Sequence, residues 1–282
     1  MTKQSWARQT NKPVDLTGNP FFLDEKQVAW VRTTLAQMSR EDKIGQLFCL
    51  CSVEGTKEEA EAIFQVCKPG GMMLRPMRTE QAVQLTVALE KLSQIPMLIA
   101  ANLEKGGNGI VTEGTLFGSP LEVAATDDPE MAEKLGATCA EEAAAVGCNW
   151  AFAPSVDIDY NFRNPITNTR TYGSDPERVK RMGLAYLRAV QSRKIAACFK
   201  HFPGDGVDER DQHLLSSVNS LSCRKWDRTY GTIYKACIDA GALTCMVGHI
   251  LQPAYSRKLD PSLRNEDILP ASLSPELKLG LL

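Results

Sequence analysis

Six short apolar segments recur along the chain and alternate with segments of helical character. Most of them are continuous apolar blocks, which is typical of strands buried on both faces of a parallel sheet. The pattern therefore predicts six strands, in GQLFCLC (45–51), GMMLR (71–75), PMLIAANL (96–103), NWAFAPSVDI (149–158), AACFKHF (196–202) and TCMVGHI (244–250).

Helical patterns occupy the intervals between these strands. Residues 79–94 carry apolar side chains at helical spacing, with Thr79 as the expected N-cap. Two other helices are expected to begin at the sequence DPE, at 128–130 and 175–177, where aspartate caps and proline takes the first helical position. Alternating strands and helices predict an α/β fold, either a doubly wound parallel sheet or a (β/α)8 barrel.

Polar residues gather where the strand segments end. They are Asn102, Glu104, Asp157, Asp159, Lys200, His201 and His249. In a barrel, this is the rim on which active sites are built. No glycine fingerprint opens a helix directly after the first strand and GxxxxGK[ST] is absent, so nucleotide binding is disfavoured. Six strands are two fewer than a closed barrel needs, and residues 274–282 read as the start of a further helix.

The composition is that of an ordinary globular protein, with 282 residues, 43% of them hydrophobic, and a formal net charge of −2. No cluster of Lys and Arg points to nucleic acid or an anionic membrane, so a small neutral molecule or a sugar fits better. The first twenty residues lack the apolar core of a signal peptide, and we expect a soluble cytoplasmic protein. Nine cysteines without a CxxC pair indicate free thiols in a reducing compartment.

The segment KHFPGDGVDERDQH (200–213) holds two of the three histidines. The spacing of Asp211 and His213 lets the carboxylate bind one ring nitrogen and leaves the other to carry a proton. Lys200 and His201, at the strand end, suit hydrogen bonds to substrate hydroxyls. The proline and glycines between them and the dyad would let the loop approach a ligand and move as a lid. On spacing alone, a solvated surface loop is an equally good interpretation.

This segment resembles the signature KH(F/I)PG(H/D)G…D(S/T)H of the β-N-acetylglucosaminidase branch of glycoside hydrolase family 3, with Gln212 where that family usually has Ser or Thr. Other segments resemble motifs of the same family in the same order, from about residue 36 onward. They are MSREDKIGQL (38–47), IPMLIAANLE (95–104), GCNWAFAPSVDI (147–158) and TRTYGSDP (169–176). On these motifs the chain is identified as similar to that family.

The resemblance implies a retaining exo-glycosidase on a (β/α)8 TIM-type barrel, hydrolysing terminal β-N-acetylglucosaminides. It implies His213 as the acid/base, paired with Asp211 in place of the usual second carboxylate. It further implies that the sugar's hydroxyl and N-acetyl groups are bound by Arg170, Lys200 and His201.

Two further positions belong to the expected sugar site. Asn102 stands where the family usually has an aspartate, and its amide can still donate and accept hydrogen bonds. His249 resembles a pocket-lining residue, although a structural hydrogen bond at the rim explains it equally well. The arginine that follows the family's EGG has no counterpart after Glu104, so one sugar contact is missing or comes from elsewhere.

The family's nucleophile is an aspartate beyond the next strand, and no aspartate of this chain matches its motif. We therefore expect the nucleophile to be absent and the chain by itself to be inactive. Residues 1–35 are expected to form an N-terminal extension, and 36–282 a truncated barrel with about six of eight strands. An open barrel exposes two strand edges and an apolar interior, so we expect poor solubility or association, with the oligomeric state left open.

Several alternatives to the hexosaminidase interpretation stay open. A histidine acid/base would tolerate phosphate as acceptor, which suits a glycoside phosphorylase; another β-glycosidase and an inactive sugar-binding barrel are the others. The expected partner is a small carbohydrate derived from the cell wall. No cofactor is expected, and no metal, because the three histidines match no familiar zinc spacing such as HExxH.

Overall fold

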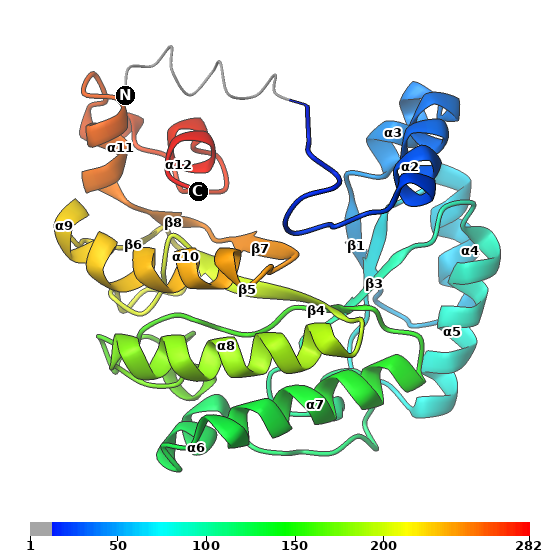
Figure 1. Ribbon diagram of the computed structural model, residues 1–282, viewed down its shortest axis with the longest axis horizontal. Coiled ribbons are helices and arrows are strands. Elements are labelled where there is room, and N and C mark those ends of the chain that lie inside the picture. The colour runs from blue at the N-terminus through cyan, green and yellow to red at the C-terminus, as the bar shows by residue number, and fades with distance from the viewer. Residues whose placement is uncertain (1–12) are drawn as a thin grey trace.

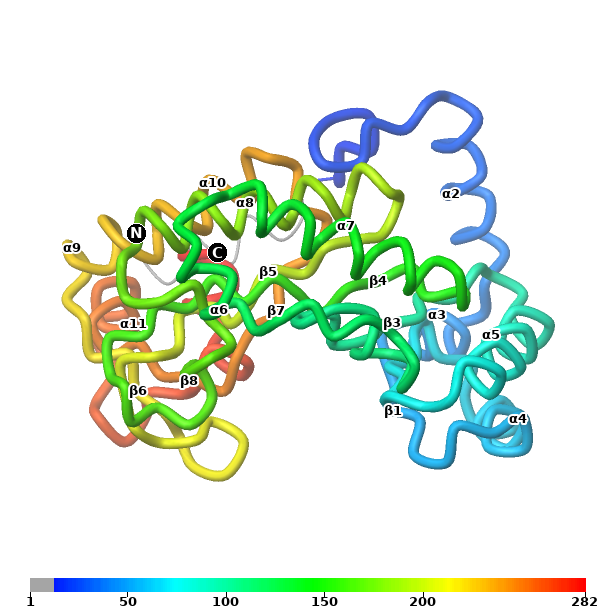
Figure 2. Tube along the Cα trace, turned by 90° about the horizontal axis from the view of Figure 1, so that it is seen from below, coloured from blue at the N-terminus to red at the C-terminus, as the bar shows by residue number. Residues whose placement is uncertain are grey.

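The computed structural model describes residues 13–282 and shows an α/β fold around one parallel sheet (Figure 1). The sheet follows the order β1-β2-β3-β4-β5-β7, with every pairing parallel. It curls as half of a barrel, so the expected incomplete TIM-type barrel is confirmed (Figure 2). The strands are β1 (Cys49–Cys51), β2 (Gly71–Met73), β3 (Leu98–Ala101), β4 (Trp150–Ala151), β5 (Ala196–Phe202) and β7 (Thr244–Val247).

The predicted strands differ from the observed ones mainly in length. Strand β5 coincides with the predicted 196–202, whereas β4 keeps only two residues of the predicted 149–158. Pro154 lies in that segment and has no N–H for the ladder, so regular pairing stops before it. The chain nevertheless continues beside β5, because the N–H of Lys200 donates to the Pro154 carbonyl at 3.1 Å.

Helices cover the outer face of the sheet, with α4 and α5 beside β1 to β3 and the pair α7 and α8 beside β3 to β5 (Figure 1). Leu89, Leu135 and Leu187 from three of these helices are fully buried against the sheet's Ala101 and Ala151 in one core. The helices are α2 (Glu25–Gln37), α3 (Arg40–Gly45), α4 (Lys57–Val66), α5 (Thr79–Leu92), α6 (Pro120–Ala125), α7 (Pro129–Ala145), α8 (Pro176–Ser192), α9 (Cys223–Trp226), α10 (Thr232–Asp239), α11 (Pro253–Leu259) and α12 (Pro275–Gly280).

The predicted helix starts are confirmed at Asp128, Asp175 and Ser274, whose side chains accept from backbone N–H groups of the first turn. The prediction for Thr79 is wrong. Thr79 is the first residue of α5, and its N–H and hydroxyl both donate to the Glu113 carboxylate at 3.0 Å. A distant acid therefore satisfies the helix end that a local cap was expected to satisfy.

A second, two-stranded sheet holds the loops that follow β5 and β7. Its strands β6 (Ser217–Val218) and β8 (Ile250–Leu251) pair in parallel. Because β6 follows the 200–213 segment and β8 follows His249, this sheet fixes the loop of the predicted dyad to the end of the next barrel strand.

The structure tests only in part the expectations about membrane spans, the first twenty residues and the boundary after residue 35. Among the helices of residues 13–282, none is both long and apolar enough to cross a bilayer. The interpretation of the first twenty residues rests largely on 1–12, which lie outside the described residues. The boundary expected after residue 35 falls within α2 and stays a prediction.

Candidate active site

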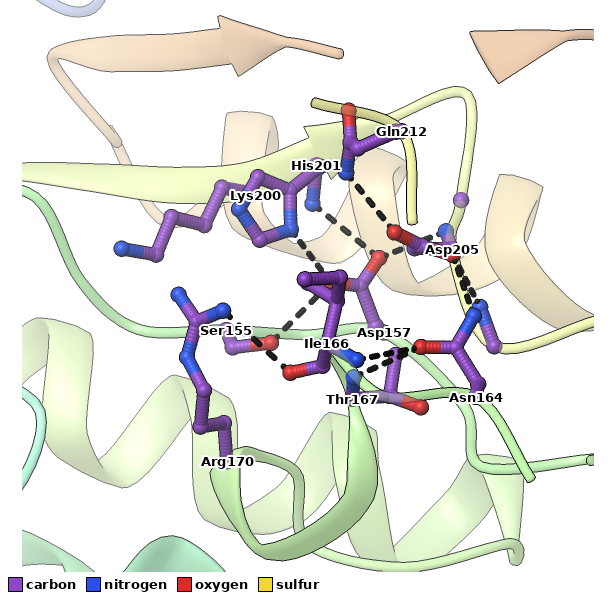
Figure 3. Close-up of polar contacts among 12 residues, drawn as sticks. Ser155, Asp157, Asn164, Ile166, Thr167, Arg170, Lys200, His201, Asp205 and Gln212 are labelled. Carbon is purple, nitrogen blue, oxygen red and sulfur yellow. Dashed lines mark hydrogen bonds and ion pairs between the residues drawn. The ribbon is translucent and has the colours of Figure 1, made fainter. Parts of the chain in front are cut away.

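Four residues expected to bind sugar meet at the carboxyl ends of the strands. Asn102 follows β3, Lys200 and His201 stand near the end of β5, and Arg170 closes a 3-10 turn at Asn168–Arg170. The Lys200 ammonium donates to the Asn102 amide oxygen at 3.3 Å. Lys200 and Arg170 extend to the same side of His201 (Figure 3). Parallel strands place their carboxyl ends at one rim, which brings distant segments together.

Lys200 and His201 are adjacent in β5, yet both join the polar network. In a regular strand, neighbouring side chains point to opposite faces. The pairing of β5 with β7 shifts register between Lys200 and Phe202, and an irregularity of this kind re-aims a side chain. Both residues are buried, with 1% and 6% of their surface exposed.

Glu104 binds both cations of the site. One carboxylate oxygen lies 2.6 Å from the Lys200 ammonium, and the two oxygens accept from the Arg170 guanidinium at 2.7 Å each. Burial alone would raise the pKa of Glu104, but the charges and hydrogen bonds of Lys200 and Arg170 outweigh it and hold the pKa well below its ordinary range. Glu104 is therefore ionised and fixes the two cations beside each other.

A buried histidine–aspartate pair lies behind these cations. His201 Nδ1 is 2.6 Å from one oxygen of Asp157, whose other oxygen accepts from the backbone N–H groups of His201 and Asp205. Burial opposes ionisation of Asp157, but His201 and these donors keep its pKa lowered. With a proton on Nδ1, the imidazole of His201 has a fixed orientation and its Nε2 can accept a hydrogen bond.

Asp205 continues the network toward the loop. One of its oxygens accepts from the Asn164 amide at 2.8 Å and the other from the Gln212 amide at 2.7 Å (Figure 3). Burial and the nearby negative charge of Asp157 raise the pKa of Asp205. Two buried carboxylates in one network therefore differ in how readily they hold a proton.

The predicted dyad forms. His213 Nδ1 lies 2.7 Å from the Asp211 carboxylate, and the His213 N–H donates to the same oxygen at 2.8 Å. Burial acts against ionisation of Asp211, but the His213 N–H and imidazole lower its pKa. The His213 side chain is 59% exposed, so its Nε2 is accessible to a ligand. This geometry permits proton transfer through Nε2, whereas the catalytic role stays a prediction.

His249 takes up a rim position with local partners. Its Nδ1 lies 2.8 Å from the Ser272 hydroxyl, and its backbone N–H donates to the Gln212 side-chain oxygen at 2.8 Å. Its side chain is therefore held by a structural hydrogen bond, the second of the two interpretations that its sequence position allowed. Its contact with sugar stays a prediction.

The glycines of the 200–213 segment are packed rather than free to hinge. Gly204 and Gly206 are buried and have φ of +111° and +98°. A Cβ at Gly204 would lie 2.4 Å from the Tyr230 ring, and one at Gly206 would lie 2.1 Å from the Ile158 carbonyl oxygen. Left-handed backbone and close packing explain these two glycines, and a lid movement of the loop stays a prediction.

Sequence reasoning did not assign roles to Glu104, Asp157, Asp205 and Gln212. All four are polar yet at most 8% exposed, which marks them as members of a buried network. Their positions after strands were a usable signal, since three of them follow β3, β4 and β5. Their partners could not be inferred, because the contacts join segments up to 96 residues apart, as between Glu104 and Lys200.

Nothing in residues 13–282 groups three or more His, Cys, Asp or Glu side chains in a way that could hold a metal ion. The nine cysteines are free thiols, of which Cys139, Cys148, Cys198 and Cys237 are buried. Burial raises the pKa of Cys148 to about 12, which makes its thiol unreactive. Cys49 and Cys51 are exposed on the edge strand β1.

Comparison with known proteins begins with a family model. The glycosyl hydrolase family 3 N terminal domain matches residues 39–282. A curated relative from Cellulomonas fimi, named beta-N-acetylglucosaminidase/beta-glucosidase, is 49% identical over 269 residues, covering 95% of this chain and 48% of its own length. A beta-hexosaminidase A from Pseudoalteromonas piscicida is 32% identical over 145 residues, covering 48% of this chain and 24% of its own.

Solved structures agree with these matches. A beta-glucoside phosphorylase, BglX bound to 2FGlc, superposes with a TM-score of 0.91 at 48% identity, covering 95% of this chain and 48% of that one. A glycoside hydrolase family 3 beta-N-acetylglucosaminidase from Paenibacillus sp. str. FPU-7 has a TM-score of 0.74 at 25% identity, covering 86% and 48%. The chain thus spans half or less of the length of these relatives.

Proposed function

This chain belongs to glycosyl hydrolase family 3, and from that premise we propose that it supplies the sugar-binding and acid/base parts of a site that cleaves β-N-acetylglucosaminides. The observation that carries the proposal is that an exposed Asp211–His213 dyad and a Lys200–Glu104–Arg170 cluster, of which Lys200 and Glu104 are buried, both follow the carboxyl ends of the strands. The dyad offers a proton carrier, and the cluster offers oriented donors for sugar oxygens.

His213 performs the proton transfers in this proposal. Asp211 holds the proton on Nδ1, so Nε2 of the imidazolium donates its proton to the glycosidic oxygen as the bond to the anomeric carbon breaks. The neutral imidazole then takes a proton from the water that releases the sugar, which restores the imidazolium. The carboxylate that attacks the anomeric carbon is assigned to no residue of this chain.

The cation cluster orients the sugar. The Lys200 ammonium already has three partners, namely Glu104, the Phe152 carbonyl and Asn102. The contact to the Asn102 amide is the weakest at 3.3 Å, so a sugar hydroxyl can take its place at small cost. Arg170 supplies further N–H donors, and the Nε2 atom of His201 can accept a hydrogen bond from a sugar hydroxyl.

The proposal is tested by replacing His213 with Ala in the 282-residue chain and in the full product of its reading frame. In an active protein, the variant should lose roughly 100-fold or more in kcat/KM on alkyl and disaccharide substrates and much less on aryl substrates with good leaving groups, which need no proton. Undiminished turnover of both substrate types in the variant would contradict the assignment.

A phosphorylase is the second candidate, because the relative with a TM-score of 0.91 is a beta-glucoside phosphorylase. A neutral imidazole does not repel an incoming phosphate as a carboxylate base would. Product analysis with and without phosphate separates the two functions, since a glycosyl phosphate forms only in a phosphorylase. Parallel assays of N-acetyl-β-glucosaminides and β-glucosides decide the sugar.

An inactive sugar-binding barrel is the non-enzymatic alternative. This alternative would be favoured if calorimetry showed that the 282-residue chain binds N-acetylglucosamine, while neither this chain nor the full product of its reading frame formed any product. We further propose that the protein acts in the cytoplasm on cell-wall-derived amino sugars, which fits its free thiols. Fractionation of cells with an antibody to the chain tests this location.

A further inference from the structure

Gln212 precedes the proposed acid/base and is buried, whereas the His213 side chain is 59% exposed. Only 5% of the Gln212 surface is accessible. A glutamine in such a position needs hydrogen-bond partners, because burying an unpaired amide is costly.

Both ends of the Gln212 amide are used. Its nitrogen donates to Asp205 Oδ2 at 2.7 Å, and its oxygen accepts from the His249 backbone N–H at 2.8 Å. Asp205 stands near the start of the loop, and His249 lies just after β7. The Gln212 side chain therefore connects the end of the loop that carries the dyad both to the start of the same loop and to the residue that follows β7.

The surroundings are shaped to this side chain. A Cβ placed on Gly248 would lie 2.6 Å from the Gln212 side-chain oxygen, so a larger residue there would push the amide out of its present position. The backbone N–H of Asp205 donates to Asp157, which holds His201. Through Asp205, Gln212 links the exposed dyad to the buried part of the sugar site.

From these contacts we propose that Gln212 is the positioning residue of the dyad, holding the loop so that His213 faces the sugar site. The inference rests on the proposed function, since it concerns the same proton transfer. A Ser or Thr side chain is two atoms shorter and cannot span from Asp205 to His249. The loop geometry of this chain therefore depends on the full length of glutamine.

The test compares Gln212→Met, which keeps the shape without hydrogen bonds, with Gln212→Glu and with the control Glu209→Gln on the same loop. Glu209 is exposed and lies 3.7 Å from Arg163, so its replacement should change nothing. The kinetic comparison uses an active protein that contains this chain. With Gln212→Met we expect roughly a 10- to 100-fold loss of kcat on substrates with poor leaving groups, KM changed less than about twofold, and little effect on good leaving groups.

Gln212→Glu supplies a pH-dependent readout. A protonated glutamic acid can still donate to Asp205, whereas its ionised form places a second negative charge beside that carboxyl. Turnover of the variant should therefore approach that of the wild type at low pH and fall away as the pH rises, relative to the wild-type profile. If Gln212 had only a structural role, the turnover of Gln212→Glu would fall by the same factor at low pH and at high pH.

A second measurement needs no turnover. The chain has three histidines, so the ring protons of His213 can be followed by NMR in the 282-residue chain. We expect the His213 signals of Gln212→Met to move toward those of a solvated histidine, with His201 unchanged. Folded Gln212→Met with unaltered His213 signals would overturn the inference, as would unaltered kcat. A wild type without activity, or a His213→Ala variant with undiminished activity, would instead contradict the proposed function, and the NMR result would still test the inference by itself.

Discussion

At the residue scale, the feature that matters most is one carboxylate serving two cations. Glu104 and Lys200 are 8% and 1% exposed, so neither charge is compensated by water. Removing one partner of a buried ion pair leaves the others uncompensated, which costs far more than the pair contributes. The cluster proposed to bind sugar therefore also makes the protein sensitive to the loss of any one of its charges.

Glu104→Gln should lower the free energy of unfolding by about 3 kcal/mol, because Lys200 and Arg170 lose their counter-charge inside the protein. Urea unfolding measures the change. An unaltered midpoint and slope would show that the cluster is hydrated and not buried as the structure has it.

The same residue predicts a pH dependence. The pKa of Glu104 is lowered in the folded state from an ordinary value of 4.5, so its stabilising contribution is complete above pH 4.5 and is lost as the pH falls toward the folded value. Wild-type stability should thus decline on acidification more steeply than that of Glu104→Gln. Identical pH profiles of the two proteins would contradict this prediction.

At the element scale, the close contact between helices α7 and α8 depends on small residues. A Cβ at Gly136 of α7 would lie 2.7 Å from the Tyr186 carbonyl oxygen of α8 and 3.1 Å from the Ala189 Cβ. Backbone cannot yield as a flexible side chain can, so the two helices would have to separate. These helices lie beside β3 to β5, and β5 carries both Lys200 and His201 (Figure 1).

Gly136→Ala should therefore destabilise the protein by about 1–3 kcal/mol through overpacking, although alanine is the better helix former by about 1 kcal/mol. Thermal or urea unfolding measures the sign of the change. Ala144→Gly on the exposed face of the same helix is the control, and it should cost only the helix propensity of about 1 kcal/mol. Stabilisation by Gly136→Ala would disprove the close contact.

At the scale of the whole molecule, the half-barrel leaves β1 and β7 as the outer strands of its six-stranded sheet, each hydrogen-bonded to one neighbour. Leu47 and Phe48, just before β1, are 83% and 51% exposed. Unpaired strand edges beside exposed apolar side chains favour association.

The 282-residue chain should therefore associate through β1 as its concentration rises, and light scattering after size exclusion measures the mass. Leu47→Lys adds a charge beside this edge and should reduce the association, because charges at strand edges oppose pairing. A monomer at every concentration would show that the edge is protected.

The order of the strands and most helix starts follow from the sequence, because they depend on local patterns. Apolar blocks predicted β5 at its observed bounds, and the aspartate and proline signals located α7 and α8. The N-cap prediction for Thr79 was wrong because the start of its helix is bound by Glu113, 34 residues away. Local spacing also allowed the Asp211–His213 contact, which joins residues two apart.

The sequence by itself thus determined the half-barrel, the rim and the dyad, since periodicity, capping and short spacing act over a few residues. Only the tertiary structure decided that Glu104 joins Lys200 to Arg170, that Asp157 holds His201 and that Gln212 ties the loop to β7. These contacts link different strands at one rim, and burial makes each partner necessary. Their geometry depends on how the sheet curls, which no local pattern records.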